Sequence, residues 1–119
     1  MTPFGRKMRE LRAARGMTLT RMAAEIGVSA AYLSALENGR RGRPTPGLVR
    51  QICGLFGIIW DEADEIAALA EVSHPAAVVR TGGLSPEATA LANELAAGIA
   101  DLSPEAVADL RARLAAWRR

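Results

Sequence analysis

Residues 30–37 predict a short helix whose outward face carries short or uncharged side chains. At helical spacing Leu33 and Leu36 share one side, which we expect to be buried. The residues on or beside the opposite face are Ala30, Ala31, Tyr32, Ser34, Ala35 and Asn38. Ser34 and Asn38 can hydrogen-bond to base edges or phosphates, and alanine methyl groups can contact thymine methyl groups. This face predicts close approach to a nucleic acid; the alternative is an ordinary alanine-rich helix of high propensity.

Three arginines follow this helix in the loop formed by residues 40–46. Arg40, Arg41 and Arg43 are the densest positive charge in the chain, and a glycine and two prolines keep this loop from forming helix. Guanidinium groups bind phosphate oxygens well. Upstream, Thr18 stands at an expected helix start, where its hydroxyl and backbone N–H can also bind a phosphate. These positions predict an anion-binding surface around residues 30–38.

Two short helices joined at Gly27 are expected to position these groups. Thr18 can cap a first helix that runs to Ile26, and Ser29 can cap a second helix over residues 30–37. The turn between them requires a positive φ, which glycine adopts without the strain of a β-carbon. This arrangement is a helix-turn-helix.

Ala23 is expected where these two helices cross. Met22 and Ile26 lie on the inward face of the first helix, and the short side chain of Ala23 lets the second helix approach closely. A larger residue at this position would overpack the crossing.

Three further helices are predicted in the N-terminal part of the chain. They cover about residues 4–14, residues 46–56 with Thr45 as N-cap, and a segment that opens with the acidic run 61–65. Their inward residues are Phe4, Met8 and Leu11, then Val49, Ile52, Cys53 and Phe56, then Ile66 and Leu69. The acidic run is expected to complement the helix dipole, and a contact with RNA polymerase is the alternative.

The C-terminal part contains a five-residue repeat, Leu-Ser-Pro-Glu-Ala, at residues 84–88 and 102–106. Each copy provides a serine N-cap, a proline at the first helical position and an early glutamate. The apolar residues on the two helix faces are Leu91, Leu95, Ile99, Val107, Leu110, Leu114 and Trp117. We expect an antiparallel helical hairpin whose apolar faces dimerise, or alternatively pack against the N-terminal part of the same chain.

The charge distribution supports a division of the chain. Residues 1–50 hold ten basic and three acidic residues, a net charge of +7, whereas residues 51–119 hold five basic and ten acidic residues, a net charge of −5. We expect an anion-binding domain over residues 1–72, a linker over residues 73–83, and the helical hairpin over residues 84–119.

Residues 18–39 resemble the DNA-binding domain of the Cro and repressor proteins of lambdoid phages, the XRE family. The matching positions are Met22, Ala23, Ile26, Gly27, Val28, Leu33 and Leu36, followed by the ending Leu36-Glu37-Asn38-Gly39. The resemblance covers about residues 4–60. It implies an all-α fold, with a five-helix lambda-repressor-like DNA-binding domain ahead of the C-terminal hairpin.

The resemblance also implies which residues bind DNA. Positions that meet DNA in the family correspond to Thr18, Leu19, Ala30, Ala31, Ser34 and Ala35, and positions that hold the backbone or reach the minor groove correspond to Asn38, Arg40 and Arg43. We add Ser29, Tyr32 and Arg41 to this predicted surface. Arg12 and Glu37 match a pair that often forms a structural ion pair. Many relatives have glutamine where this chain has alanine, so specificity is expected to depend also on DNA shape.

Composition excludes several other classes of protein. A single cysteine, Cys53, excludes an internal disulfide and a cysteine-rich zinc site. There is no signal peptide and no apolar run long enough to span a membrane, which predicts a cytoplasmic protein. The family resemblance implies that this protein is bacterial and associated with the nucleoid. His74 is a lone histidine in the linker, and no phosphate loop or nucleophile motif is present. We therefore expect neither an enzyme nor a bound cofactor or metal.

These observations predict a transcriptional regulator that binds specific sequences of double-stranded DNA. A homodimer that represses from a palindromic operator is favoured, because one helix-turn-helix contacts few base pairs and two half-sites need two copies. The alternative is an antitoxin or another interaction module whose C-terminal hairpin binds a partner protein. RNA binding is less favoured, because the chain has few aromatic residues for stacking.

Overall fold

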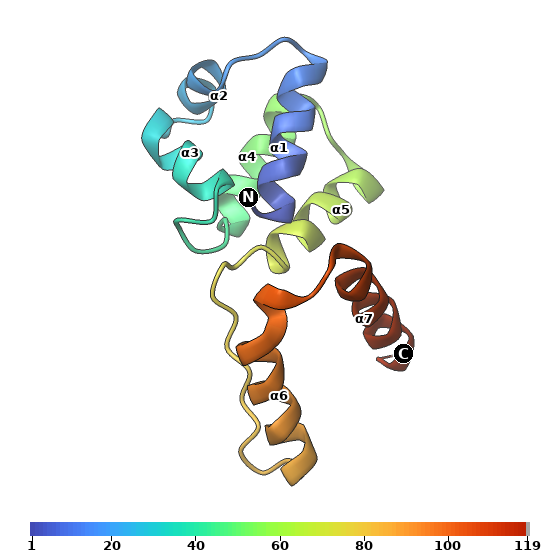
Figure 1. Ribbon diagram of the computed structural model, residues 1–119. Coiled ribbons are helices and arrows are strands. Elements are labelled where there is room, and N and C mark those ends of the chain that lie inside the picture. The colour runs from blue at the N-terminus through green and yellow to red at the C-terminus, as the bar shows by residue number, and fades with distance from the viewer. Residues whose placement is uncertain (119) are drawn as a thin grey trace. The chain divides into compact units, whose positions relative to one another are not determined.

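The computed structural model describes residues 1–118 and contains only helices in that range (Figure 1). The all-α prediction is therefore confirmed. The chain divides into two compact units, Met1–Ala77 and Val78–Arg119. None of the helices in the described part of the chain is long and apolar enough to cross a lipid bilayer.

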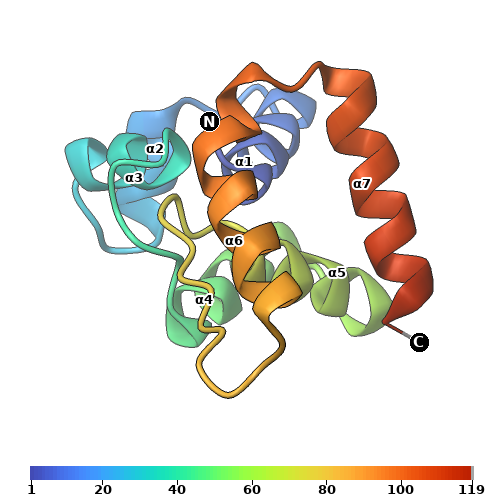
Figure 2. The same cartoon turned by 60° about the horizontal axis from the view of Figure 1, so that its bottom comes forward.

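The N-terminal unit contains five α-helices. They are α1 (Pro3–Ala14), α2 (Leu19–Glu25), α3 (Ala30–Glu37), α4 (Pro46–Phe56) and α5 (Trp60–Glu71). Helix α1 contacts both α3 and α5, α2 packs on α3, and α4 packs on α5 (Figure 2). The predicted α3 has the observed bounds, and the other helices begin or end within about two residues of the prediction.

Side-chain caps explain where four of these helices begin. The hydroxyls of Thr18, Ser29 and Thr45 each accept a hydrogen bond from the backbone N–H three residues later, which confirms the three predicted caps. Thr2 caps α1 in the same way, so that α1 begins at Pro3, one residue earlier than predicted. These caps satisfy backbone donors that the first helical turn leaves without partners.

The core of this unit joins all five helices. Its largest fully buried apolar side chains are Phe4, Met8, Met22, Leu33, Leu36, Ile52 and Ile66. At one edge, the Phe4 N–H donates to Ser73 Oγ at 2.9 Å, and the Ser73 hydroxyl donates to the Leu69 carbonyl. This buried chain of hydrogen bonds fastens the end of α5 to the start of α1.

The C-terminal unit contains α6 (Pro86–Gly98), a short 3-10 helix (Ile99–Asp101) and α7 (Pro104–Trp117). Ser85 and Ser103 cap the two α-helices as predicted. Neither α-helix buries a residue, so the structure differs from a tightly packed hairpin.

Candidate nucleic-acid interface

The turn between α2 and α3 is built around Gly27. Its φ is +74°, the conformation predicted from the sequence. The Val28 N–H donates to the Ala23 carbonyl at 3.0 Å, and the Tyr32 N–H donates to Ser29 Oγ at 3.0 Å. These bonds set the direction in which α3 leaves the turn.

Ala23 lies in the core on the helix that packs on α3, and only 1% of it is exposed. We predict that Ala23→Leu destabilises the unit by about 1–3 kcal/mol, because the added atoms force α2 and α3 apart. Urea unfolding followed by circular dichroism measures the loss. Ala24→Leu is the matched control at an exposed position of the same helix. Equal stability of the two variants would contradict a close crossing at Ala23.

The outward face of α3 is small and accessible. Ala31 is exposed, and the other predicted contact residues of this helix are half-buried at its sides. The Asn38 side-chain amide donates to the Ser34 carbonyl at 2.9 Å, so that one of its N–H groups holds the end of α3. Asn38 Oδ1 accepts no protein hydrogen bond among the described residues. The face therefore presents methyl groups, the hydroxyls of Ser34 and Tyr32, and the Asn38 amide.

The three arginines after α3 have different surroundings. The Arg41 guanidinium lies 5.6 Å from the centroid of the Tyr32 ring, a cation–π distance that holds this charge beside α3. Arg43 instead pairs with Glu71 of α5 at 3.0 Å, and both side chains are exposed. Arg40 is exposed, and its backbone N–H donates to the Ala35 carbonyl at 2.8 Å. The structure thus places Arg41 beside the α3 face and pairs Arg43 with α5.

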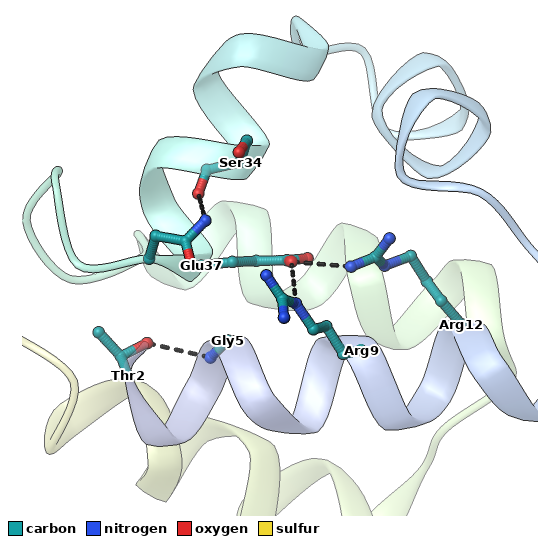
Figure 3. A network of polar contacts seen from close by, with 7 residues as sticks. Thr2, Gly5, Arg9, Arg12, Ser34 and Glu37 are labelled. Atoms are coloured by element: carbon teal, nitrogen blue, oxygen red, sulfur yellow. Dashed lines mark hydrogen bonds and ion pairs between the residues drawn. The ribbon is translucent and has the colours of Figure 1, made fainter.

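A buried carboxylate fastens the end of α3 to α1. Glu37 Oε1 lies 2.8 Å from Arg12 Nη2 and 3.7 Å from Arg9 Nε (Figure 3). Burial raises the pKa of Glu37, and the charges of Arg12 and Arg9 only partly oppose this effect. Within residues 1–118, Glu37 Oε2 and Arg12 Nε have no hydrogen-bond partner. The Arg12–Glu37 ion pair therefore fixes the orientation of α3, although two of its buried polar atoms lack a hydrogen bond.

Helices α1 and α3 approach each other closely at Gly5. A β-carbon on Gly5 would lie 2.2 Å from the Glu37 carbonyl oxygen, which already accepts the Thr2 N–H at 3.1 Å. Thr2 and Gly5 lie beside the Glu37 group in Figure 3. Neither Thr2 nor Gly5 was among the residues predicted from the sequence. The available signal was a glycine in the first turn of a helix, where glycine costs stability.

Arg15 also has a role that the sequence did not reveal. Its guanidinium donates to the carbonyls of Phe56 at 2.7 Å and Leu55 at 3.3 Å, and it lies 5.1 Å from the centroid of the Phe56 ring. A cation at this place satisfies the last carbonyl groups of α4 and complements its dipole. Arg15 therefore joins the end of α1 to the end of α4.

Leu19, the first residue of α2, is half-buried against the core, whereas the predicted dimerisation residues lie in the C-terminal unit. Leu91, Leu95, Ile99, Leu110, Leu114 and Trp117 are exposed, and Val107 is half-buried. His74 Nδ1 accepts the Ala76 N–H at 3.0 Å. Across residues 1–118 no three His, Cys, Asp or Glu side chains are grouped so that they could hold a metal ion.

Comparison with known proteins agrees with this geometry. A family model described as a helix-turn-helix domain matches residues 3–69. The chain is 38% identical over 61 residues to the uncharacterized HTH-type transcriptional regulator RghRB of Bacillus subtilis (strain 168). These 61 residues are 51% of this chain and 44% of that protein. It is 36% identical over 76 residues to the HTH-type transcriptional repressor RghR of the same organism. These 76 residues are 64% of this chain and 56% of that protein.

The chain spans about half the length of these curated relatives. No solved structure matches it.

Proposed function

The chain belongs to the helix-turn-helix domain family, and from this premise we propose that it is a transcriptional repressor that binds a palindromic operator in double-stranded DNA as a homodimer. The observation that carries the proposal is the α2–turn–α3 unit. A glycine turn and a buried alanine set the angle between its helices, and α3 presents small side chains outward. In such a unit the second helix lies in the major groove.

Contacts to bases are proposed for the outward face of α3. Ala31 and Ala35 can contact thymine methyl groups, and the Ser34 hydroxyl can hydrogen-bond to a base edge. Because these side chains are short, they allow close approach but provide few hydrogen bonds. Sequence-dependent DNA shape is therefore proposed to add to the selectivity of this face.

Contacts to the phosphate backbone are proposed for the helix starts and for the loop arginines. Thr18 and Ser29 stand at helix N-termini, where backbone N–H groups and the helix dipole attract anions. Arg40 and Arg41 are exposed, and Arg41 is held beside α3 by Tyr32. These contacts position α3 without depending on the base sequence.

We predict that Arg40→Ala combined with Arg41→Ala weakens binding to all duplex sequences. Loss of two phosphate contacts should reduce the slope of log K against log salt by about two. Fluorescence anisotropy with one labelled duplex at several salt concentrations measures both quantities. Arg80→Ala, an exposed arginine outside the N-terminal unit, serves as the control. An unchanged affinity and slope would show that the loop does not contact DNA.

The homodimer is proposed to form through the C-terminal unit. The apolar stripes of α6 and α7 are exposed, with Leu91 66% and Leu114 54% accessible. Exposed apolar patches of this kind commonly mark interaction surfaces. Two copies related by a two-fold axis would match two half-sites about one helical turn apart. A stable, soluble dimer of the chain alone would count against an obligatory partner protein.

A further inference from the structure

A groove between α4 and α5 is not used by the proposed DNA-binding surface. Its volume is about 560 Å³. Much of its lining has short side chains or none, at Gly54, Ala63, Ala67 and Ala70. Apart from its chain neighbours and the backbone of its own helix, nothing lies within 4 Å of the point where a β-carbon on Gly54 would stand. Val49 contributes to the apolar floor. The groove therefore has room for large apolar side chains from another molecule.

The two rims of the groove carry opposite charges. Asp64 and Glu71 line the α5 side, Arg50 lines the α4 side, and Arg43, from the loop ahead of α4, pairs with Glu71 at 3.0 Å. Asp64 and Glu71 are seven residues apart on one helix, which corresponds to about 10 Å along its axis. An occupant that matches this side needs two positive charges at the same separation beside an apolar stripe.

Helix α7 has this pattern. Leu110, Leu114 and Trp117 are 46%, 54% and 75% exposed and lie on one face of the helix. Arg111 and Arg118 lie along one flank of that face and are also seven residues apart. Neither arginine forms an ion pair within residues 1–118. The charges and the spacing of α7 therefore complement those of the α5 rim.

We propose that α7 from a second copy of this chain lies in the α4–α5 groove, antiparallel to α5. Arg111 then pairs with Glu71 and Arg118 with Asp64, while Leu114 and Trp117 fill the space above the glycine and alanine walls. The inference rests on the proposed homodimer and identifies the surface that covers α7. A two-fold axis makes the contact twice, because each copy supplies one groove and one α7.

The Arg43–Glu71 pair does not prevent this arrangement. Both of its side chains are exposed, and exposed pairs of this kind are held weakly because water competes for each charge. Glu71 can therefore exchange Arg43 for Arg111 of the second copy. Arg43 belongs to the loop that follows α3, so the exchange would free its guanidinium for a phosphate.

Charge reversal in the full chain tests the proposed contact. Asp64→Arg with Glu71→Arg, and separately Arg111→Glu with Arg118→Glu, should each raise the dimer dissociation constant by about tenfold or more in sedimentation equilibrium. Combining all four changes should restore it to within a few-fold of the original value. Glu87→Arg with Glu94→Arg is the matched control, because these exposed α6 residues are also seven apart.

Each other outcome overturns the inference in a recognisable way. A dimer that responds to the α6 variant and not to the groove variant forms elsewhere, and the proposed homodimer then stands without this contact. If the chain is monomeric at every concentration, both the proposed homodimer and this inference are wrong. Binding of that monomer to duplex DNA would still support the DNA-binding part of the proposed function.

The single native cysteine allows a second test that identifies the occupant. Cys53 lines the groove, so Leu114→Cys should form a disulfide with Cys53 of another copy under mild oxidation. A band at dimer size on a non-reducing gel is the expected result. Ala112→Cys, on the opposite side of α7, is the control and should not cross-link. A disulfide within one chain, or none, would overturn docking by a second copy.

Discussion

Replacement of Gly5 by alanine is expected to destabilise the N-terminal unit by about 3 kcal/mol and to weaken DNA binding. The new β-carbon would lie 2.2 Å from the Glu37 carbonyl oxygen and 2.7 Å from its Cα atom. Both atoms belong to the backbone, so no change of side-chain rotamer can relieve the contact. Helix α3 must move away from α1, and its outward face moves with it.

Circular dichroism during urea unfolding measures the loss of stability, and anisotropy with a labelled duplex measures the loss of affinity. Gly54→Ala is the matched control. Gly54 also lies inside a helix, but the place of its β-carbon is empty, so alanine should stabilise α4 by about 0.5–1 kcal/mol. If Gly5→Ala were stabilising to the same degree, the close approach of α1 and α3 would be absent.

Replacement of Arg12 by methionine is expected to cost about 3 kcal/mol at neutral pH, because it leaves the Glu37 carboxylate buried without its 2.8 Å partner. Arg9 offsets only part of the loss, since it is 3.7 Å from the carboxylate and largely exposed. Adding Glu37→Gln to this variant should recover much of the stability, because a neutral amide tolerates burial better than a carboxylate.

The pH dependence of this variant has a definite sign. Burial raises the pKa of Glu37 in the folded protein, so the folded state binds this proton more tightly than the unfolded state. Stability therefore falls as pH rises from the unfolded pKa through the folded pKa. Removing Arg12 removes a charge that lowers the pKa of Glu37, so the fall extends to higher pH.

Urea unfolding at a series of pH values tests this account of Glu37. The stability difference between the original protein and Arg12→Met should be small in acid, where Glu37 is protonated in both, and should grow toward neutral pH. The double variant Arg12→Met, Glu37→Gln should lack this dependence. A difference that stays constant over the whole range would mean that ionised Glu37 is not the source of the instability.

Local features of the fold could be predicted from the sequence. The N-caps Thr18, Ser29 and Thr45 and the positive φ of Gly27 depend only on neighbouring residues, and the structure shows all four. The outward face of α3 follows from helical spacing for the same reason. Its contacts with DNA remain predictions.

Contacts between distant segments could not be predicted in the same way. Gly5 meets Glu37, Arg15 meets the end of α4, and Ser73 meets Phe4, and no periodic pattern encodes any of these three pairs. Trp60 is another example, because it has a φ of +54° although it is not glycine. Such features depend on how the helices pack and on which backbone groups need partners.

Helix α3 is proposed to contact base edges, and selection of bound sequences from random duplex DNA by the purified chain tests this contact most directly. We predict enrichment of an inverted repeat whose half-site centres lie about 10 base pairs apart, and loss of that enrichment with Ala31→Glu. Folded protein that retains random duplexes through their phosphates and enriches no sequence would contradict the claim. In that case the exposed face of α3 would not be the surface that recognises DNA.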